Sequence, residues 1–233
     1  MRGHEFPDRA TPAPPDVVPY ITGYSREQNI TPRLTQHPSG HGLVFVDETP
    51  HDRDSFGVPW VRPSLLPKVR RGEPLLREAV VHPFRQRRVM RDQLCQVCTR
   101  PPADPEGRLL FLMRDAGRPI EEGERTASPP VCVPCAGISV QLCPRLRRHH
   151  VAAWVEHVPA WGVVGIVHDP LTLEPMVGDV EVAYDSPAAR WVVAARLVSQ
   201  LYGVEPVDLE EEFARLGRDR LEAEFARVVE LAA

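Results

Sequence analysis

The clearest pattern of apolar and polar residues lies in the last third of the chain. Residues 151–155 and 161–167 are short apolar runs, and residues 180–184 alternate between apolar and charged side chains. A half-buried strand shows this alternation, and short apolar runs bounded by turn residues are typical of buried strands. We therefore predict three strands that form a small sheet.

Two helices are predicted after these strands. Asp185-Ser186-Pro187 supplies a capping residue and a first-turn proline, so we predict a helix that reaches Tyr202 and buries Trp191. A second helix begins at Asp208, with a glutamate three residues later as in a capping box, and runs toward residue 231. The apolar stripe of this helix shifts to a different face near residue 217.

The first part of the chain lacks such periodicity. Residues 1–66 are rich in proline, and 11–15 should be extended, although 43–46 is apolar enough for a short strand. Residues 1–40 have the composition of an arm that is disordered alone or wraps a partner. The arm also carries apolar side chains, so its docking onto this chain or another chain is an equal alternative to disorder. These side chains are Tyr20, Ile21, Tyr24 and Ile30.

Residues 67–92 are basic. Residues 73–90 fit a helix that Pro83 interrupts, and its last turns are dense in arginine. From Arg62 to Arg91 there are nine basic and two acidic residues, whereas 204–233 holds nine acidic and four basic ones. The charge is therefore polarised along the chain, although the net charge is only −4.

Two Cys-x-x-Cys motifs carry the strongest chemical signal. Cys95 and Cys98 form the first knuckle, and Cys132 and Cys135 form the second. Four thiolates are the complete ligand set of a closed tetrahedral zinc site, in which the metal is structural because no position is open to water or substrate. The 33 residues between the knuckles exceed the roughly 15–20 of the commonest zinc ribbon.

Two other uses of these cysteines compete with zinc. A thioredoxin-like redox pair should follow a buried strand, and residues 91–94 are not one. Two disulfides would need an oxidising compartment. The first eight residues lack the apolar stretch of a signal peptide, so we expect reduced thiols, Zn²⁺ and a cytoplasmic protein.

The segments around the knuckles also have recognisable patterns. Residues 108–113 form an apolar run that predicts a strand or half of a hairpin. Ile138, Leu142 and Leu146 recur every four residues, which predicts a helix that begins near Cys135 and ends or kinks at Pro144.

A knuckle, a hairpin and a second knuckle that opens a helix resemble a treble-clef finger over about residues 94–148. Some treble clefs belong to HNH-type nucleases, whose catalytic histidine lies between the knuckles; no histidine occurs from Cys95 to Cys135. The wider pattern, from the arginines before Cys95 to Leu142-Cys143-Pro144, is also similar to a family of uncharacterised zinc-finger proteins of high-GC bacteria. That resemblance implies a bacterial protein and no established activity.

Other candidate groups are weaker. Cys143 fits a core thiol better than an additional ligand, and His149 and His150 fit a solvated segment. The groups His51, Asp52 and Asp54 and His168 and Asp169 fit polar turns, with a second metal as the alternative. No nucleophile or phosphate-loop motif is present, so we lean against an enzyme without excluding a site built from distant residues.

The arginines around the finger suggest a partner. A metal-fixed module flanked by arginines can bind phosphates, which favours nucleic acid or a nucleic-acid-associated protein. The alternatives are a solvated or internally paired surface, a protein–protein adaptor, and an enzyme of unrecognised type. The candidate phosphate-binding residues, which we expect to converge on one face, are Arg85, Arg87, Arg88, Arg91, Arg145, Arg147 and Arg148.

The predicted fold class is therefore α+β: a treble-clef-like zinc finger joined to a small sheet with C-terminal helices and a Pro-rich N-terminal arm. The boundaries we expect are 1–66 for the arm, 67–92 for the basic segment, 93–150 for the four-cysteine zinc-finger module and 151–233 for the α+β body. No apolar run approaches the roughly 18–20 residues of a membrane span. The long amphipathic terminal helix makes a homodimer a further possibility.

Overall fold

A computed structural model describes residues 11–102 and 104–232, and it confirms a mixed helix and sheet architecture. The strands are β1 Asn29–Ile30, β2 Leu34–Gln36, β3 Leu43–Phe45, β4 Arg62–Pro63, β5 Leu109–Arg114, β6 Arg125–Thr126, β7 His150–His157, β8 Ala160–His168, β9 Pro175–Ala183, β10 Val192–Gln200 and β11 Tyr202–Val207. The helices are α1 Pro83–Arg91, α2 Val133–Leu142, α3 Leu209–Leu216 and α4 Arg218–Ala232, with 3-10 turns at η1 Pro50–Asp52, η2 Lys68–Arg70 and η3 Pro187–Trp191.

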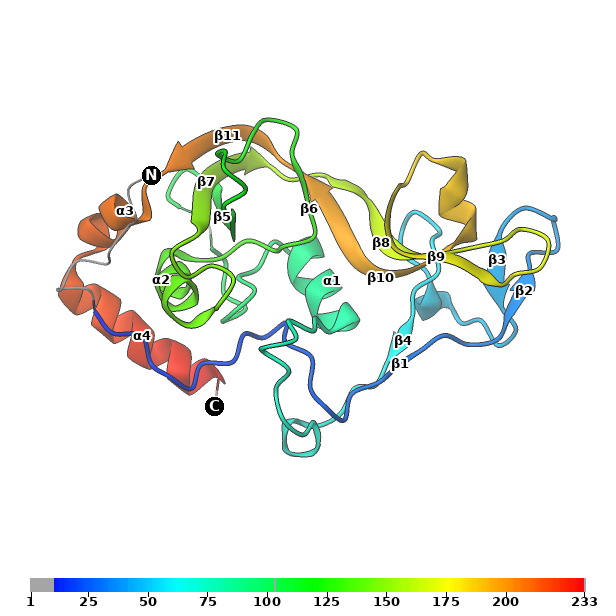
Figure 1. The fold of residues 1–233 in the computed structure, drawn as a ribbon, viewed down its shortest axis with the longest axis horizontal. Coiled ribbons are helices and arrows are strands. Elements are labelled where there is room, and N and C mark those ends of the chain that lie inside the picture. Colours follow the sequence, from blue (N-terminus) through cyan, green and yellow to red (C-terminus); the bar gives the residue numbers. More distant parts are fainter. Residues whose placement is uncertain (1–10, 103, 233) are drawn as a thin grey trace.

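A long antiparallel ribbon runs through both halves of the molecule (Figure 1). One side of the ribbon is β7 followed by β8, and the other is β10 followed by β11. Only Val158 and Pro159 separate β7 from β8, and only Leu201 separates β10 from β11. The ribbon therefore belongs to two sheets at once, with strand orders β6-β10-β8-β9 and β11-β7-β5.

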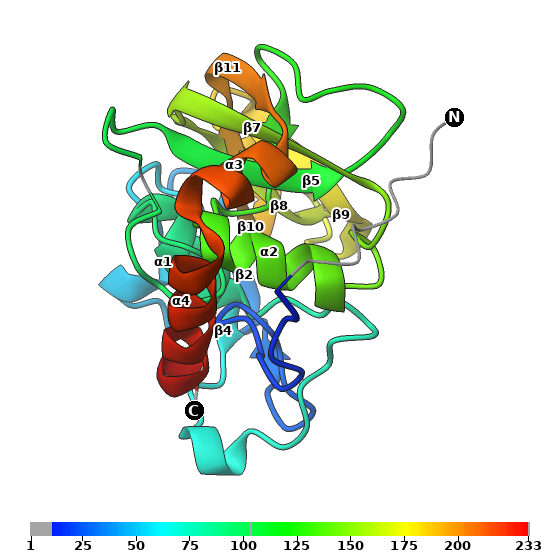
Figure 2. The ribbon, with the colours of Figure 1, turned by 90° about the vertical axis from the view of Figure 1, so that its left-hand side faces the viewer.

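Each sheet has its own core. The three helices α2, α3 and α4 lie together beside the β11-β7-β5 sheet (Figure 2). The core between them includes all four knuckle cysteines and buries Trp154 and Phe225. A second core covers the other half, where β8 and β10 pack against Trp60 and Met90.

The three predicted strands are confirmed as β7, β8 and β9, but the helix expected after Asp185 is wrong. Ser186 caps only the short turn η3, and the chain continues as the central strand β10, which pairs with both β6 and β8. A strand buried on both faces is a continuous apolar run, which periodicity cannot distinguish from a buried helix.

The second C-terminal helix is confirmed and is divided in two. The Asp208 side chain accepts the Glu210 backbone N–H at the start of α3, and Gly217 separates α3 from α4 with φ +80°. The apolar stripe of α4, including Leu221, Phe225 and Val228, packs inside this chain. The surface predicted for a homodimer is thus occupied by the chain's own core.

The described part of the N-terminal arm docks on the rest of this chain. Val17 is buried in the core that contains the knuckle cysteines, in the half of the molecule formed by β5, β7, β11 and α2–α4, which we call the zinc half. The Trp60–Val61 segment pairs with Ala194 of β10. The strand expected at 43–46 is confirmed as β3. Residues 1–10 of the predicted arm lie outside the described residues.

The helix predicted from 73 to 90 is wrong before Pro83. Residues 73–82 form turns and isolated bridges, and α1 begins only at Pro83, after His82 accepts the Arg85 backbone N–H. Proline at the first helical position explains this start. Within the described ranges, none of the helices is long and apolar enough to cross a membrane.

Candidate metal centre and arginine groove

The four cysteines of the two knuckles come together in one cluster. Their Sγ atoms all lie within 4.8 Å of one another, and Cys98 Sγ lies 3.8 Å from Cys132 Sγ. Sulfurs at 2.3 Å from a tetrahedral zinc are about 3.8 Å apart. The cysteines are free thiols, so the two-disulfide alternative does not describe this structure. The donor set and its spacing fit a structural zinc ion.

Local backbone geometry aims the sulfurs at a common point. In the first knuckle the Cys95 N–H donates to the Arg100 carbonyl, and the Thr99 N–H donates to the Cys95 carbonyl. Thr99 has φ +61°, a left-handed conformation that turns the chain sharply after Cys98. In the second knuckle Cys132 is the N-cap of α2 and Cys135 lies in its first turn. A helix N-terminus favours thiolates, because its dipole is positive there.

The four thiols cannot all ionise without a cation. A hydrogen bond from Cys132 lowers the pKa of Cys98, whereas the hydrogen bond with Cys132 and burial raise the pKa of Cys135. Negative charge on one sulfur thus disfavours charge on the next. Binding a divalent metal would displace the remaining protons.

The segment between the knuckles differs from the expected hairpin. β5 is the predicted strand, but it pairs with β7, and β6 pairs with β10 in the other sheet. The helix after the second knuckle is confirmed as α2, which ends at Leu142, shortly before Pro144. Cys143 is half-buried at this C-terminus and does not belong to the cysteine cluster.

Arg85 is an interior residue. Its guanidinium donates to both carboxylate oxygens of Glu27, at 2.8 and 2.6 Å, and to the Thr22 carbonyl. Burial acts to raise the pKa of Glu27, but the hydrogen bonds and charge of Arg85, together with His82 and the Tyr24 N–H, keep that pKa below its usual value. Arg85 therefore attaches the arm to α1, where nucleic acid has no access.

Three of the other predicted arginines line one wall of a groove beside α1. The groove has a volume of about 740 Å³. Its lining residues are Pro50, His51, Asp52, Arg53, Trp60, Val61, Arg62, Pro63, Leu65, Pro83, Phe84, Arg87, Arg88 and Arg91. Four of these residues were not predicted as site residues from the sequence, because most of them lie in the arm, which has no periodic pattern. They are Arg53, Trp60, Arg62 and Phe84.

The three arginines of α1 differ in availability. The Arg87 guanidinium lies 4.4 Å from the centre of the Trp60 ring, and burial lowers the pKa of Arg87. Arg88 is exposed and donates to the Tyr20 hydroxyl at 3.0 Å. Arg91 is exposed and paired with its neighbour Asp92. Arg88 and Arg91 are thus the exposed arginines of this wall, and Asp92 offsets part of the charge of Arg91.

The arginines of the opposite wall are already engaged. Arg62 binds both carboxylate oxygens of Asp52, at 2.7 and 2.8 Å, and Arg53 binds both carboxylate oxygens of Glu48. Acidic side chains thus offset much of the charge of this wall. Phe84, by contrast, is 46% exposed and presents an aromatic ring to the groove.

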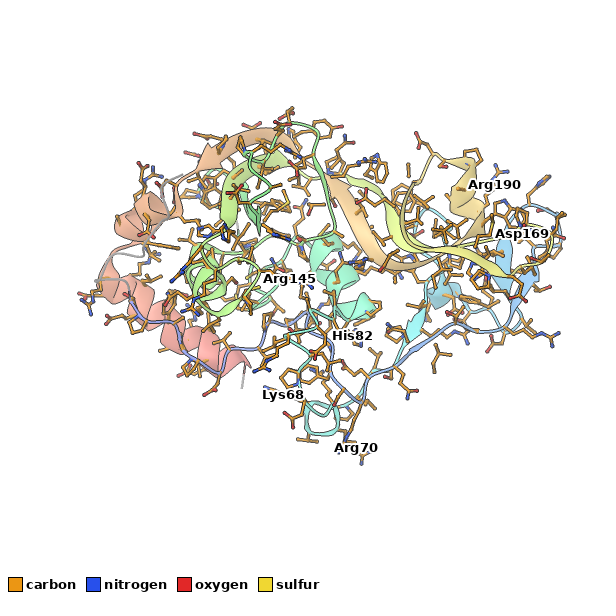
Figure 3. All side chains as sticks on the ribbon, in the orientation of Figure 1. Lys68, Arg70, His82, Arg145, Asp169 and Arg190 are labelled. Atoms are coloured by element: carbon orange, nitrogen blue, oxygen red, sulfur yellow. The ribbon has the colours of Figure 1, made fainter. Side chains whose placement is uncertain are left out.

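The arginines after α2 are not part of the groove lining. Arg145, Arg147 and Arg148 are exposed, and no described residue forms an ion pair with them. Figure 3 shows Arg145 in the half that contains α2 and Arg190 in the other half. The acidic helix α3 does not neutralise the α1 arginines, since its Glu211 and Glu212 pair with Arg215.

The groups considered for a second metal have structural roles. Asp52 pairs with Arg62, and Asp54 accepts from the Trp60 indole and the Tyr184 hydroxyl. His168 is buried, and Asp169 accepts backbone N–H groups of its own turn. Across 11–102 and 104–232, the knuckle cysteines are the only group with the spacing of a metal site.

Comparison with known protein families, with characterised proteins and with solved structures finds no significant match. The four-cysteine cluster is therefore the part of the predicted zinc-finger resemblance that the structure supports.

Proposed function

We propose that this chain is a zinc-stabilised binding protein that holds nucleic acid in the groove beside α1. The observation that supports the proposal is the wall on which Arg88, Arg91 and Phe84 are exposed together. Guanidinium groups bind phosphates, and an exposed aromatic ring stacks on bases of single strands. The sequence alone offered arginines without a stacking aromatic ring.

Zinc would act on this surface through the backbone. The Leu94 N–H donates to the Val89 carbonyl, so α1 continues directly into the first knuckle at Cys95. Four protein ligands leave the metal no open position, so its role is to hold the knuckles and the end of α1 in place. Reduced thiols are required for this role, which agrees with the cytoplasmic location expected from the sequence.

The first prediction concerns the salt dependence of nucleic-acid binding. Changing Arg88→Ala and Arg91→Ala together should weaken binding of a single-stranded oligonucleotide and lower the log–log salt slope by about one to two units, because two phosphate contacts are lost. Fluorescence anisotropy across a salt series measures this slope, with zinc content checked for each variant.

The matched control is the double change Arg145→Ala and Arg147→Ala, which removes two exposed arginines outside the groove lining. We expect this control to keep the wild-type slope. Equal slopes for wild type and the Arg88/Arg91 variant would contradict the proposal.

A protein–protein adaptor is the second candidate function. Leu65, 66% exposed, and Phe84 form an apolar rim on the same groove. An apolar docking surface responds little to salt, so salt-independent capture of a protein by this groove would favour the adaptor.

A further inference from the structure

A short arm segment, residues 11–22, lies along the zinc half as irregular backbone with turns at 15–16 and 20–21. Figure 2 shows the start of the described arm beside α2. The Gln141 side chain, near the end of α2, accepts the Ala13 backbone N–H at 2.9 Å and donates to the Thr11 carbonyl at 3.1 Å. One amide side chain thus satisfies two backbone groups of the arm segment.

The same segment also contacts the first zinc knuckle. The Tyr20 N–H donates to the Val97 carbonyl at 3.1 Å, and the Ile21 N–H donates to the Gln96 carbonyl at 3.3 Å. Gln96 and Val97 are the two residues between Cys95 and Cys98, so their carbonyls are oriented by the fold that the metal stabilises. Both acceptors belong to the knuckle itself.

Between these two sets of hydrogen bonds, Val17 enters the zinc core. It is 5% exposed and belongs to the buried cluster that contains Cys95, Cys98 and Cys135. Prolines at 12, 14, 15 and 19 fix φ around it, which reduces the conformational entropy lost when the segment docks.

We propose that the first knuckle and α2 form a docking surface for a proline-rich segment, that residues 11–22 are its ligand within this chain, and that docking depends on zinc. Without the metal the knuckle would lose the geometry that presents the Gln96 and Val97 carbonyls. The arm segment would then lose two acceptors and its valine site together.

This coupling must act in both directions. If zinc strengthens docking of the arm segment by some factor, docking strengthens zinc binding by the same factor. The coupling also reaches the groove, since Tyr20 in this segment binds Arg88 of α1 through its hydroxyl. The coupling between zinc and arm docking, and its extension to Arg88, do not depend on which ligand the groove binds.

The experiment measures zinc affinity in a variant with a weakened arm contact. Val17→Thr keeps the shape of the side chain but places a hydroxyl in the apolar site, which should loosen the segment. Competition with a chromophoric zinc chelator should show affinity weakened about tenfold, in the usual range of coupling. Val69→Thr, at a 92% exposed position in η2, is the matched control and should bind zinc as the wild type does.

Amide hydrogen exchange separates arm docking from general destabilisation. In zinc-bound Val17→Thr, protection should fall at the Tyr20 and Ile21 amides, while the Val61 and Ala194 amides, which pair in the other half, keep theirs. Metal-free wild type should show the same selective loss. Unchanged zinc affinity in Val17→Thr, or Tyr20 and Ile21 amides that remain protected in that variant, would overturn the proposal even if the metal-free protein unfolds entirely.

Discussion

Gln86 connects three segments of the chain although its side chain is fully buried. Its amide nitrogen donates to the Ala127 and Leu197 carbonyls, and its amide oxygen accepts the Leu197 N–H at 2.9 Å. These bonds fix α1 to β10, beside the bulge at 194–196. A glutamine among arginines gave no sign of this role in the sequence.

Replacing Gln86 should therefore be costly. Gln86→Leu removes the side-chain partner of two buried Leu197 backbone groups and of the half-buried Ala127 carbonyl, and each buried unsatisfied group costs about 1–3 kcal/mol. We expect the free energy of unfolding to fall by about 3 kcal/mol or more in urea titrations, whereas Gln28→Leu at an exposed position should change it little. A loss below about 1 kcal/mol would mean that water replaces the lost bonds.

At the residue scale, the Asp52–Arg62 ion pair should also make the free energy of unfolding depend on pH. The Arg62 hydrogen bonds hold the pKa of Asp52 well below its ordinary value, and the carboxylate is buried. A depressed folded-state pKa gives stability that is complete above the unfolded pKa of about 4 and is lost as pH falls below it.

The wild type should thus exceed Asp52→Asn in free energy of unfolding by about 2–3 kcal/mol at about pH 7, and the difference should shrink steadily between about pH 4 and pH 2. Denaturant titrations at several pH values measure it. Asp47→Asn, at an exposed partner of the same arginine, is the control and should show a much smaller acid-dependent difference. A difference for Asp52→Asn that stays constant over this pH range would exclude the ion pair as its source.

At the scale of elements, the sequence predicted those whose pattern is local. The knuckles, α2, β5 and β7–β9 follow from spacing and apolar runs. The strand β10 does not, because Val192–Gln200 is buried by partners on both sides and its apolar positions also fit a helix. The sequence does contain one indication, Gly165, where a Cβ would lie 2.2 Å from the Val193 carbonyl oxygen. A glycine inside a strand often marks the close approach of another backbone.

The arginines show the same limit of prediction from local sequence. Seven were predicted from their position beside the knuckles, yet their environments depend on residues far away in sequence. Glu27 buries Arg85, Trp60 covers Arg87, and Arg88 remains accessible. The candidate metal ligands could be predicted because two short motifs supply them all; a groove between α1 and an aperiodic arm could not.

Across the whole molecule, the metal site supports more than the finger. The cysteine cluster lies in the same core as α2, α4 and the arm residue Val17. Cys95→Ser or Cys132→Ser should therefore abolish zinc binding and broaden or lower the unfolding transition of the entire zinc half, because structural metal binding is folding free energy.

Elemental analysis and thermal melts test this prediction. Cys143→Ala, outside the cluster, should keep one zinc per chain and cost about 1–2 kcal/mol. A Cys132→Ser protein with a full complement of zinc and an unchanged melt would refute the assignment.

The ribbon that crosses both halves also limits how the chain can be divided. The segment from residue 93 to 150 contains all four cysteines, but β5 forms its sheet with β7, which extends to residue 157, and β11 follows β10 from the other half. A fragment cut at residue 150 would expose the hydrogen-bonding edge of β5 and the apolar face of α2. Such a fragment would not reproduce the folded finger, because the strands that complete its sheet lie in the part of the chain that was removed.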